Sequence, residues 1–192
     1  AADADAHTWL RRVSLDLTGL PPTPQEIESF TSDSSDAHAV VVDRLLQSKA
    51  FGERWARHWL DLTGYADQIG TSNNVFAEHA WRYRDYVIRA FNSDVPYNQF
   101  VREHIAGDLL EHPRLNPADG SNESVIGTGF YWFGQQTHSP VDVRMHQAEF
   151  VDNQIDVLSK TFLGLTVACA RCHDHKFDPI TQQVTTVGAV HW

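Results

Sequence analysis

The stretch that decides the fold runs from residue 150 to residue 173 and reads FVDNQIDVLSKTFLGLTVACARCH. Its apolar residues step by one, four, three, four and three positions, which is the spacing of one face of a helix. These apolar residues are Phe150, Val151, Ile155, Leu158, Phe162 and Leu165. The stripe predicts a helix over 150–165 that delivers the chain directly into a cluster of two cysteines and a histidine.

That cluster, Cys169-Ala170-Arg171-Cys172-His173, has the C-x-x-C-H spacing of a c-type haem attachment site. On a helical turn, positions i, i+3 and i+4 project to one side. Both thiols can then reach the vinyl groups of one porphyrin while the adjacent imidazole lies beneath its iron. We therefore predict one covalent haem c, bound through Cys169 and Cys172, with His173 as an axial ligand of the iron.

Three other interpretations of the two cysteines stay open. A redox-active disulfide is typical of a strand-helix-strand setting, whereas this region has helical periodicity. A zinc site would use both thiols with His173 or His175, but the adjacency of Cys172 and His173 makes a closed tetrahedral site awkward. The thiols can also be inert and buried. Haem is favoured because its motif is the most specific of the four.

The order of the motifs excludes the fold of the ordinary small cytochromes c, in which a methionine follows the haem motif. Only 19 residues follow His173, and none of them is Met. A second axial ligand must therefore come mostly from upstream, unless the sixth position is open. We favour His79, at the end of a long loop, and Met145 as iron ligands. The full set of upstream candidates is His58, His79, His104, His138, Met145 and His146.

The sequence context bears on two of the histidines, His58 and His175. His58 lies between Trp55 and Trp59 and fits a hydrogen-bonded core histidine equally well. His175 is too close in sequence to His173 to reach the opposite haem face.

The rest of the chain also has helical periodicity, interrupted by two long loops at 64–79 and 111–122 that are rich in Gly, Asn, Asp and Pro. Thr23-Pro24-Gln25-Glu26 is a helix start with a capping box. The segment 125–133 is ambiguous between strand and helix, and we favour helix. One further helix is expected after a cap at Ser34-Ser35-Asp36, with Val41, Leu45 and Leu46 on one face. Three more are expected over 51–67, 81–91 and 97–110. The apolar face of the first of these carries Phe51, Trp55, Trp59 and Leu62, and that of the last carries Val101, Ile105 and Leu109. We expect an all-α fold: a single irregular helical domain with long loops and the haem motif near its C-terminus.

Composition limits the partners. The 192 residues carry 15 Lys and Arg against 25 Asp and Glu, a formal net charge of −10. No basic stripe is present to bind nucleic acid, and no apolar run approaches the ~18 residues of a membrane-spanning helix. An acidic chain of this kind favours docking to a basic partner protein.

Five segments carry a resemblance to a known family. They are LRRVSLDLTGLPPTPQEIE (10–28), FGERWARHWLDL (51–62), AWRYRDYVIRAFN (80–92), PYNQFVREHIAGDLL (96–110) and FLGLTVACARCHDHKFDPI (162–180). Over residues 9–182 the chain resembles the planctomycete-type cytochrome-associated (PSCyt-like) family, which is catalogued as a domain of unknown function.

The resemblance implies a haem-bearing helical domain located in the periplasm or otherwise outside the cytoplasm, usually within a larger exported protein. It implies that Cys169, Cys172 and His173 form the haem site, with Asp174, His175, Lys176, Phe177, Asp178 and Pro179 as a companion block. It does not specify a reaction. Residues 184–192 lack the aromatic-rich continuation of similar proteins, so we expect a cytochrome c-like domain over 1–183 and an atypical tail at the end of a fragment.

Electron transfer is the function we expect, to a redox partner protein or within a larger redox complex. Arg171 and Lys176 are the cations nearest the motif and would neutralise haem propionates, unless they are ordinary solvated side chains. A peroxidase-like enzyme with an open distal site, built from His79 with Arg82 or Arg84, is one alternative. A mainly structural subunit of a membrane-associated assembly, docking through the two long loops, is another. Whether the chain is an enzyme is left open.

Overall fold

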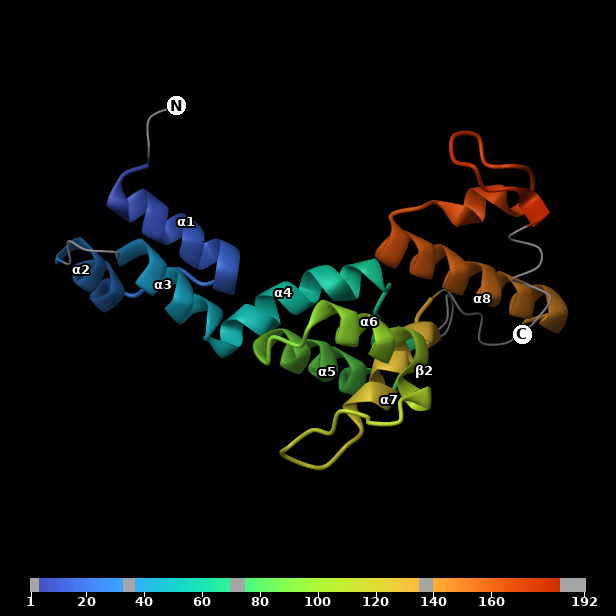
Figure 1. Cartoon of the computed structure of the whole chain (residues 1–192), viewed down its shortest axis with the longest axis horizontal. Helices are drawn as coiled ribbons and strands as arrows, with labels where there is room; N and C mark the ends of the chain where they lie inside the picture. The colour runs from blue at the N-terminus through green and yellow to red at the C-terminus, as the bar shows by residue number, and fades with distance from the viewer. Residues whose placement is uncertain (1–3, 33–36, 70–74, 135–139, 184–192) are drawn as a thin grey trace.

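A computed structural model describes residues 4–32, 37–69, 75–134 and 140–183 of the chain (Figure 1). Helices dominate these ranges, so the all-α expectation is confirmed. The α-helices are α1 (Ala6–Thr18), α2 (Pro24–Ser32), α3 (Ala37–Leu46), α4 (Lys49–Leu62), α5 (Ala80–Asn92), α6 (Tyr97–Ala106), α7 (Glu123–Gly127) and α8 (Val143–Leu158). Strands β1 (Gln68–Ile69) and β2 (Val75–Phe76) form a small antiparallel ladder. No helix in the described ranges is both long and apolar enough to cross a membrane.

The start of α2 has the capping box that the sequence predicts. The Thr23 amide donates to the Glu26 carboxylate at 2.6 Å, and the Glu26 amide donates back to the Thr23 hydroxyl at 3.3 Å. The two bonds satisfy amide groups that have no partner within the helix. The proposed cap at Ser34-Ser35-Asp36 lies outside the described residues.

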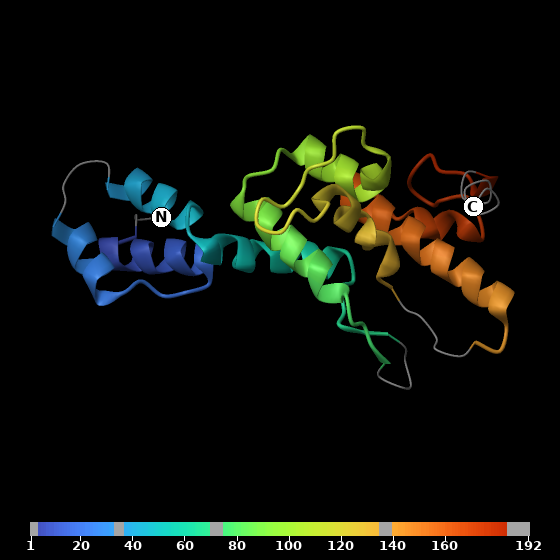
Figure 2. The ribbon, with the colours of Figure 1, turned by 90° about the horizontal axis from the view of Figure 1, so that it is seen from below.

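The described residues form two hydrophobic cores, and the helices that carry them lie along the length of the molecule (Figures 1 and 2). Helices α1, α2 and α3 enclose the N-terminal core, whose buried members are Leu10, Phe30, Val41 and Leu45. Leu46 does not join Val41 and Leu45 as expected, because it is 41% exposed. Helix α4 extends from this core to the second and larger one, which it forms with α5, α6 and α7.

The larger core is built from aromatic side chains. Phe162, beyond the end of α8, adds its ring to this cluster at 5.7 Å from Trp59 and 5.6 Å from Phe130, measured between centroids. The end of α8 is thereby anchored to the body. The buried aromatic residues are Trp59, Tyr83, Tyr86, Phe100, Phe130 and Phe133.

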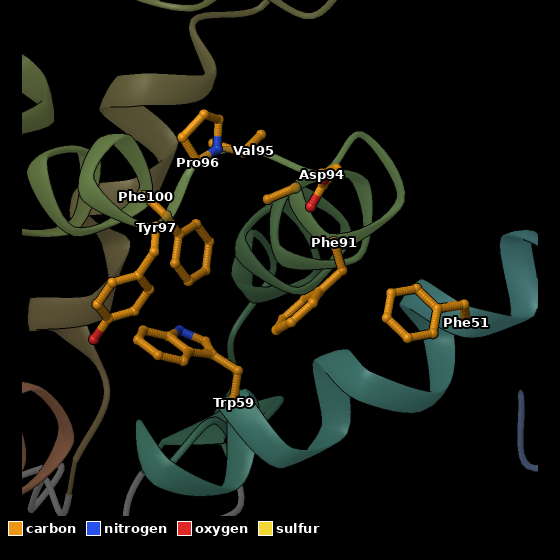
Figure 3. Close-up of a pocket in the computed structure, with 9 residues that line it drawn as sticks. Phe51, Trp59, Phe91, Asp94, Val95, Pro96, Tyr97 and Phe100 are labelled. Carbon is orange, nitrogen blue, oxygen red and sulfur yellow. The ribbon is translucent and has the colours of Figure 1, made fainter. Parts of the chain in front are cut away.

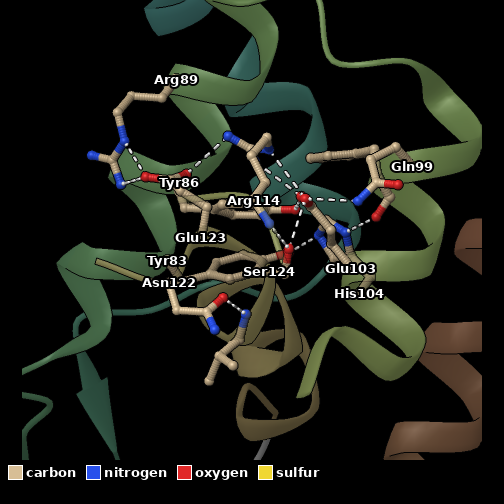
Figure 4. Close-up of polar contacts among 12 residues, drawn as sticks. Tyr83, Tyr86, Arg89, Gln99, Glu103, His104, Arg114, Asn122, Glu123 and Ser124 are labelled. Carbon is tan, nitrogen blue, oxygen red and sulfur yellow. Dashed lines mark hydrogen bonds and ion pairs between the residues drawn. The ribbon is translucent and has the colours of Figure 1, made fainter. Parts of the chain in front are cut away.

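The buried face of α6 differs from the predicted one. Ile105 is 45% exposed and Leu109 is 79% exposed, whereas Glu103 and His104 are fully buried. The reason is a polar network that apolar periodicity does not reveal (Figure 4). Helix α4 also differs from the prediction. It ends at Leu62 rather than continuing to Asp67, and Leu62 is exposed.

Glu103 is the centre of that network. Its carboxylate accepts hydrogen bonds from Arg114 at 2.9 and 3.1 Å, Tyr86 at 2.8 Å, Ser124 at 3.0 Å and Gln99 at 3.2 Å. A buried charge is tolerated only when it is paired and hydrogen-bonded in this way. Arg114 belongs to the long loop 111–122, so this loop is fixed to the body.

The segment 125–133 is helical, as favoured: it forms most of α7 and then the 3₁₀ turn η2 (Thr128–Trp132). Another short 3₁₀ turn, η1 (Gly107–Leu109), follows α6 and lies against α7. A Cβ atom on Gly107 would lie 1.8 Å from the Ser124 carbonyl oxygen, so only glycine allows this approach.

We predict that Gly107→Ala lowers the free energy of unfolding by about 3 kcal/mol, because η1 and α7 would be forced apart. Denaturant unfolding followed by circular dichroism measures the change. Gly129→Ala is the matched control, since a Cβ there meets Tyr83 at an ordinary 3.4 Å. Equal stabilities of the two variants would contradict the close approach.

Candidate functional site

The C-x-x-C-H segment is positioned by an abrupt end to α8. After Leu158 the helix widens into a π turn, η3 (Ser159–Leu163), and Gly164 then adopts a left-handed φ of 65°. The amides of Gly164 and Leu165 donate to the carbonyls of Lys160 and Ser159. The predicted helix over 150–165 therefore begins earlier, at Val143, and its α-helical part ends earlier, at Leu158.

The chain then returns along α8 through the 3₁₀ turn η4 (Val167–Arg171), which contains Cys169. In both views this C-terminal segment lies on the far side of α8 from the β1–β2 ladder (Figures 1 and 2). Cys172 follows directly as the C-cap residue of η4. Because a 3₁₀ helix has three residues per turn, side chains at i and i+3 project to the same side. Both cysteines are free thiols and both are exposed.

His173 is exposed next to Cys172, and its hydrogen bond defines its tautomer. Its Nδ1 lies 2.7 Å from the carbonyl oxygen of Asp174. A carbonyl oxygen can only accept, so Nδ1 carries the proton and Nε2 keeps a free lone pair. Histidines that bind metals usually donate their second ring N–H to such an acceptor. In His173 this tautomer leaves the lone pair on Nε2.

His175 has the opposite tautomer, and both of its ring nitrogens form hydrogen bonds within the chain. Its Nδ1 accepts from the amides of Phe177 at 3.2 Å and Asp178 at 2.8 Å, so its Nε2 carries the proton and donates to the Thr166 hydroxyl at 3.0 Å. Only 5% of its side chain is exposed. Both ring nitrogens are therefore engaged by the chain, and His175 closes the loop around the motif. Sequence reasoning missed this role because no local signal reveals the partner Thr166.

The two cations near the motif both have partners. Arg171 donates to the Asp152 carboxylate on α8 at 2.6 Å, and this pairing raises the pKa of Arg171. The Lys176 ammonium lies 5.0 Å from the centroid of the Phe177 ring, which is 82% exposed. Arg171 thus ties the motif to α8, a contact that sequence reasoning did not anticipate.

Helix α8 supplies an incompletely covered apolar surface beneath the motif. None of its residues is buried, although it carries four apolar residues of the predicted stripe. Met145 near its start is 60% exposed, and Leu163 beyond its end is 63% exposed. Because Met145 and Asp152 are seven residues apart, they lie on one side of α8 and about 10 Å apart along its axis. Met145 therefore shares the side of α8 to which Arg171 is tied.

His79 is not brought to the motif. It is the N-cap residue of α5 and lines a cavity of about 500 Å³ together with Arg82, Thr128 and Trp132. This cavity lies beside β2, whereas the motif lies across α8 (Figures 1 and 2). Arg84, the other suggested distal arginine, is paired with Asp85 at 2.9 Å.

The remaining upstream histidines occupy varied environments. His58 is exposed rather than part of the core, so the core interpretation is wrong, and its ring contacts Trp55 at 5.4 Å. His146 is half-buried on α8, next to Met145. His138 lies outside the described residues. Within the described ranges, no three His, Cys, Asp or Glu side chains gather closely enough to hold a metal ion.

His104 is fully buried and fully hydrogen-bonded. Its Nδ1 donates to the Phe100 carbonyl at 2.7 Å, and its Nε2 accepts from the Trp59 indole at 3.1 Å and lies 2.9 Å from the Tyr83 hydroxyl. Burial lowers the pKa of His104 to about 4. With both nitrogens occupied by protein groups, it has no lone pair to offer iron.

Comparisons with known proteins identify a family but no activity. Residues 1–185 match a family described as "PSCyt2: Protein of unknown function (DUF1549)". The resemblance seen in the sequence is confirmed at this level, and the description names no cofactor. No curated protein and no solved structure matches the chain.

The buried neutral imidazole of His104 predicts a pH-dependent stability. Because its pKa falls on folding from about 6.5 to about 4, the unfolded chain takes up a proton in this interval that the folded chain does not. The free energy of unfolding should therefore fall by about 3 kcal/mol as the pH drops from 7 to 4.

Denaturant unfolding at several pH values tests this. His104→Gln, although less stable at pH 7, should show a clearly smaller decrease, and His58→Gln, at an exposed position, should match the unsubstituted chain. A decrease in His104→Gln as large as in the unsubstituted chain would refute the assignment.

Proposed function

The chain belongs to the PSCyt2 family, whose function is unknown, and we propose from its own residues that it is a c-type cytochrome domain. It binds one haem, attached covalently through Cys169 and Cys172, with His173 Nε2 as the proximal ligand of the iron. It transfers electrons outside the cytoplasm, to a partner protein or within a larger redox complex.

The tautomer of His173 is the observation that carries the proposal. A proton held on Nδ1 by the Asp174 carbonyl leaves the lone pair on Nε2 of the residue that follows Cys172, and the thiols of Cys169 and Cys172 are both exposed. Neither a redox disulfide nor inert cysteines require this arrangement. A zinc site would, but it needs further ligands gathered nearby, and the described residues supply no such group.

The surroundings of the motif also suit a large flat apolar cofactor. Leu163 and Phe177 are exposed near the motif, and the apolar stripe of α8 is incompletely covered. When bound, the haem supplies one-electron chemistry at its iron, with a potential set by the axial ligands and by the surrounding polarity. The chain's own residues fix the attachment point: His175 closes the loop, and Arg171 ties it to Asp152.

Met145 is the distal ligand we favour. It is exposed and lies on the side of α8 to which the motif is tied, whereas His79 lies at a separate cavity. The net charge of −10 steers the domain toward a basic redox partner.

Covalent attachment is tested by producing the chain in a bacterial periplasm with a c-type cytochrome maturation system. Denaturing electrophoresis should retain the pigment, and a pyridine haemochrome assay should give about one haem per chain. Replacing both Cys169 and Cys172 by alanine should abolish the retained pigment, while His58→Gln should preserve it. Folded chain that retains no pigment, or that binds zinc instead, would refute the proposal.

The distal assignment is tested by carbon monoxide binding to the reduced protein. We expect little binding to the unsubstituted protein, and clear binding to Met145→Ala because the substitution opens the sixth position. His79→Gln should leave the spectrum unchanged. A carbon monoxide response in His79→Gln but not in Met145→Ala would reverse the assignment.

A further inference from the structure

A second site lies in the larger core region, away from the cysteine motif. Helices α4, α5 and α6 enclose a pocket of about 680 Å³, a size typical of small-molecule sites (Figure 3). Five of the residues that line it are aromatic: Phe51, Trp59, Phe91, Tyr97 and Phe100.

The lining offers ring faces and edges but few hydrogen-bonding groups. The Trp59 indole N–H points into the core, where it donates to the Tyr83 hydroxyl at 3.0 Å and to His104 at 3.1 Å. Trp59 therefore presents only its ring system to the pocket. Phe100 packs against it with ring centroids 4.8 Å apart. The Tyr97 side chain is 62% exposed and lies at the opening.

Among the described residues that line the pocket, Asp94 is the one with a charged side chain. Its side chain is exposed, and no described residue forms an ion pair or hydrogen bond with its carboxylate. No lysine, arginine or histidine is among the residues described as lining the pocket. Asp94 lies in the turn between α5 and α6 at a left-handed φ of 47°. The turn therefore presents an uncompensated negative charge beside a cluster of aromatic rings (Figure 3).

We propose that this pocket binds a small organic cation through a quaternary ammonium group. The negative faces of aromatic rings attract such a cation, and cages of this composition recognise it. The Asp94 carboxylate adds a formal charge of the matching sign. Primary ammonium and guanidinium groups fit less well, because each of their three or five N–H donors needs an acceptor, and Asp94 and Tyr97 supply the side-chain acceptors of the described lining. The volume leaves room for the rest of a molecule larger than the ammonium group itself.

Choline and its neutral isostere 3,3-dimethyl-1-butanol separate charge recognition from simple apolar burial. The two probes have the same shape and differ in the central atom, nitrogen in one and carbon in the other. Isothermal titration of the intact 192-residue chain should give an affinity for choline at least about tenfold higher than for the isostere. Equal affinities, or no choline binding to folded chain, would overturn the proposal.

Asp94→Asn tests the carboxylate without disturbing the turn, since asparagine adopts positive φ readily. We expect it to weaken choline binding about tenfold and to leave binding of the isostere unchanged. Glu28→Gln on α2 removes the same charge at an exposed position among the N-terminal helices, outside the pocket lining, and should change neither affinity. Undiminished choline binding in Asp94→Asn would overturn the role of the carboxylate and with it the proposal.

The same ammonium group occurs in free solutes and in lipid headgroups. Sedimentation with phosphatidylcholine vesicles, compared with phosphatidylglycerol vesicles, distinguishes these sources. Vesicle binding that free choline displaces assigns the site to a headgroup. Choline binding without vesicle binding assigns it to a free solute.

Discussion

The body of this protein depends on one buried carboxylate. Glu103 has no exposed surface, so its charge requires the donors that surround it: Arg114, Tyr86, Ser124 and Gln99. Those donors come from α5, α6, α7 and the loop 111–122, so one charge orders four segments. Removing one partner of a buried ion pair is strongly destabilising, because it leaves a buried charge uncompensated. Phe162 packs onto the resulting body and so fixes where α8 ends and where the cysteine motif begins.

Local signals in the sequence predict many of the helices but not α1 or the β1–β2 ladder, and particular residues show why. Thr23 and Glu26 form their capping box within four residues, so the pattern contains its own partner. The helical periodicity likewise predicts most of the helices. The exposure of Leu46, Leu62 and Leu109 could not be predicted, because it depends on which distant groups occupy the core.

In the candidate site, too, local spacing is predictable from the sequence, whereas contacts with other parts of the chain are not. Spacing alone keeps Cys169, Cys172 and His173 within five residues, although only Cys169 lies inside the 3₁₀ turn η4, with Cys172 as its C-cap and His173 beyond it. The partners that orient the motif, Asp152 and Thr166, are separated from it by other elements or lack a distinctive pattern. Burial removes His104 from the iron-ligand candidates. His79 lines a cavity beside β2 and so lies away from the motif. Tautomers, finally, depend on the acceptor that each ring nitrogen meets, which only the folded chain defines.

Helix α4 connects the two cores: it packs against α1 at one end and contributes Trp59 to the larger core at the other. Its 14 residues form a rod about 21 Å long. Among the described residues, the contacts between the N-terminal helices and the body are made mainly by α4. We expect a small cluster attached in this way to open as its own cooperative unit, at a lower free energy than the body. A partner that binds α1–α3 would therefore act on the body through α4, which carries Trp59 into the lining of the aromatic pocket.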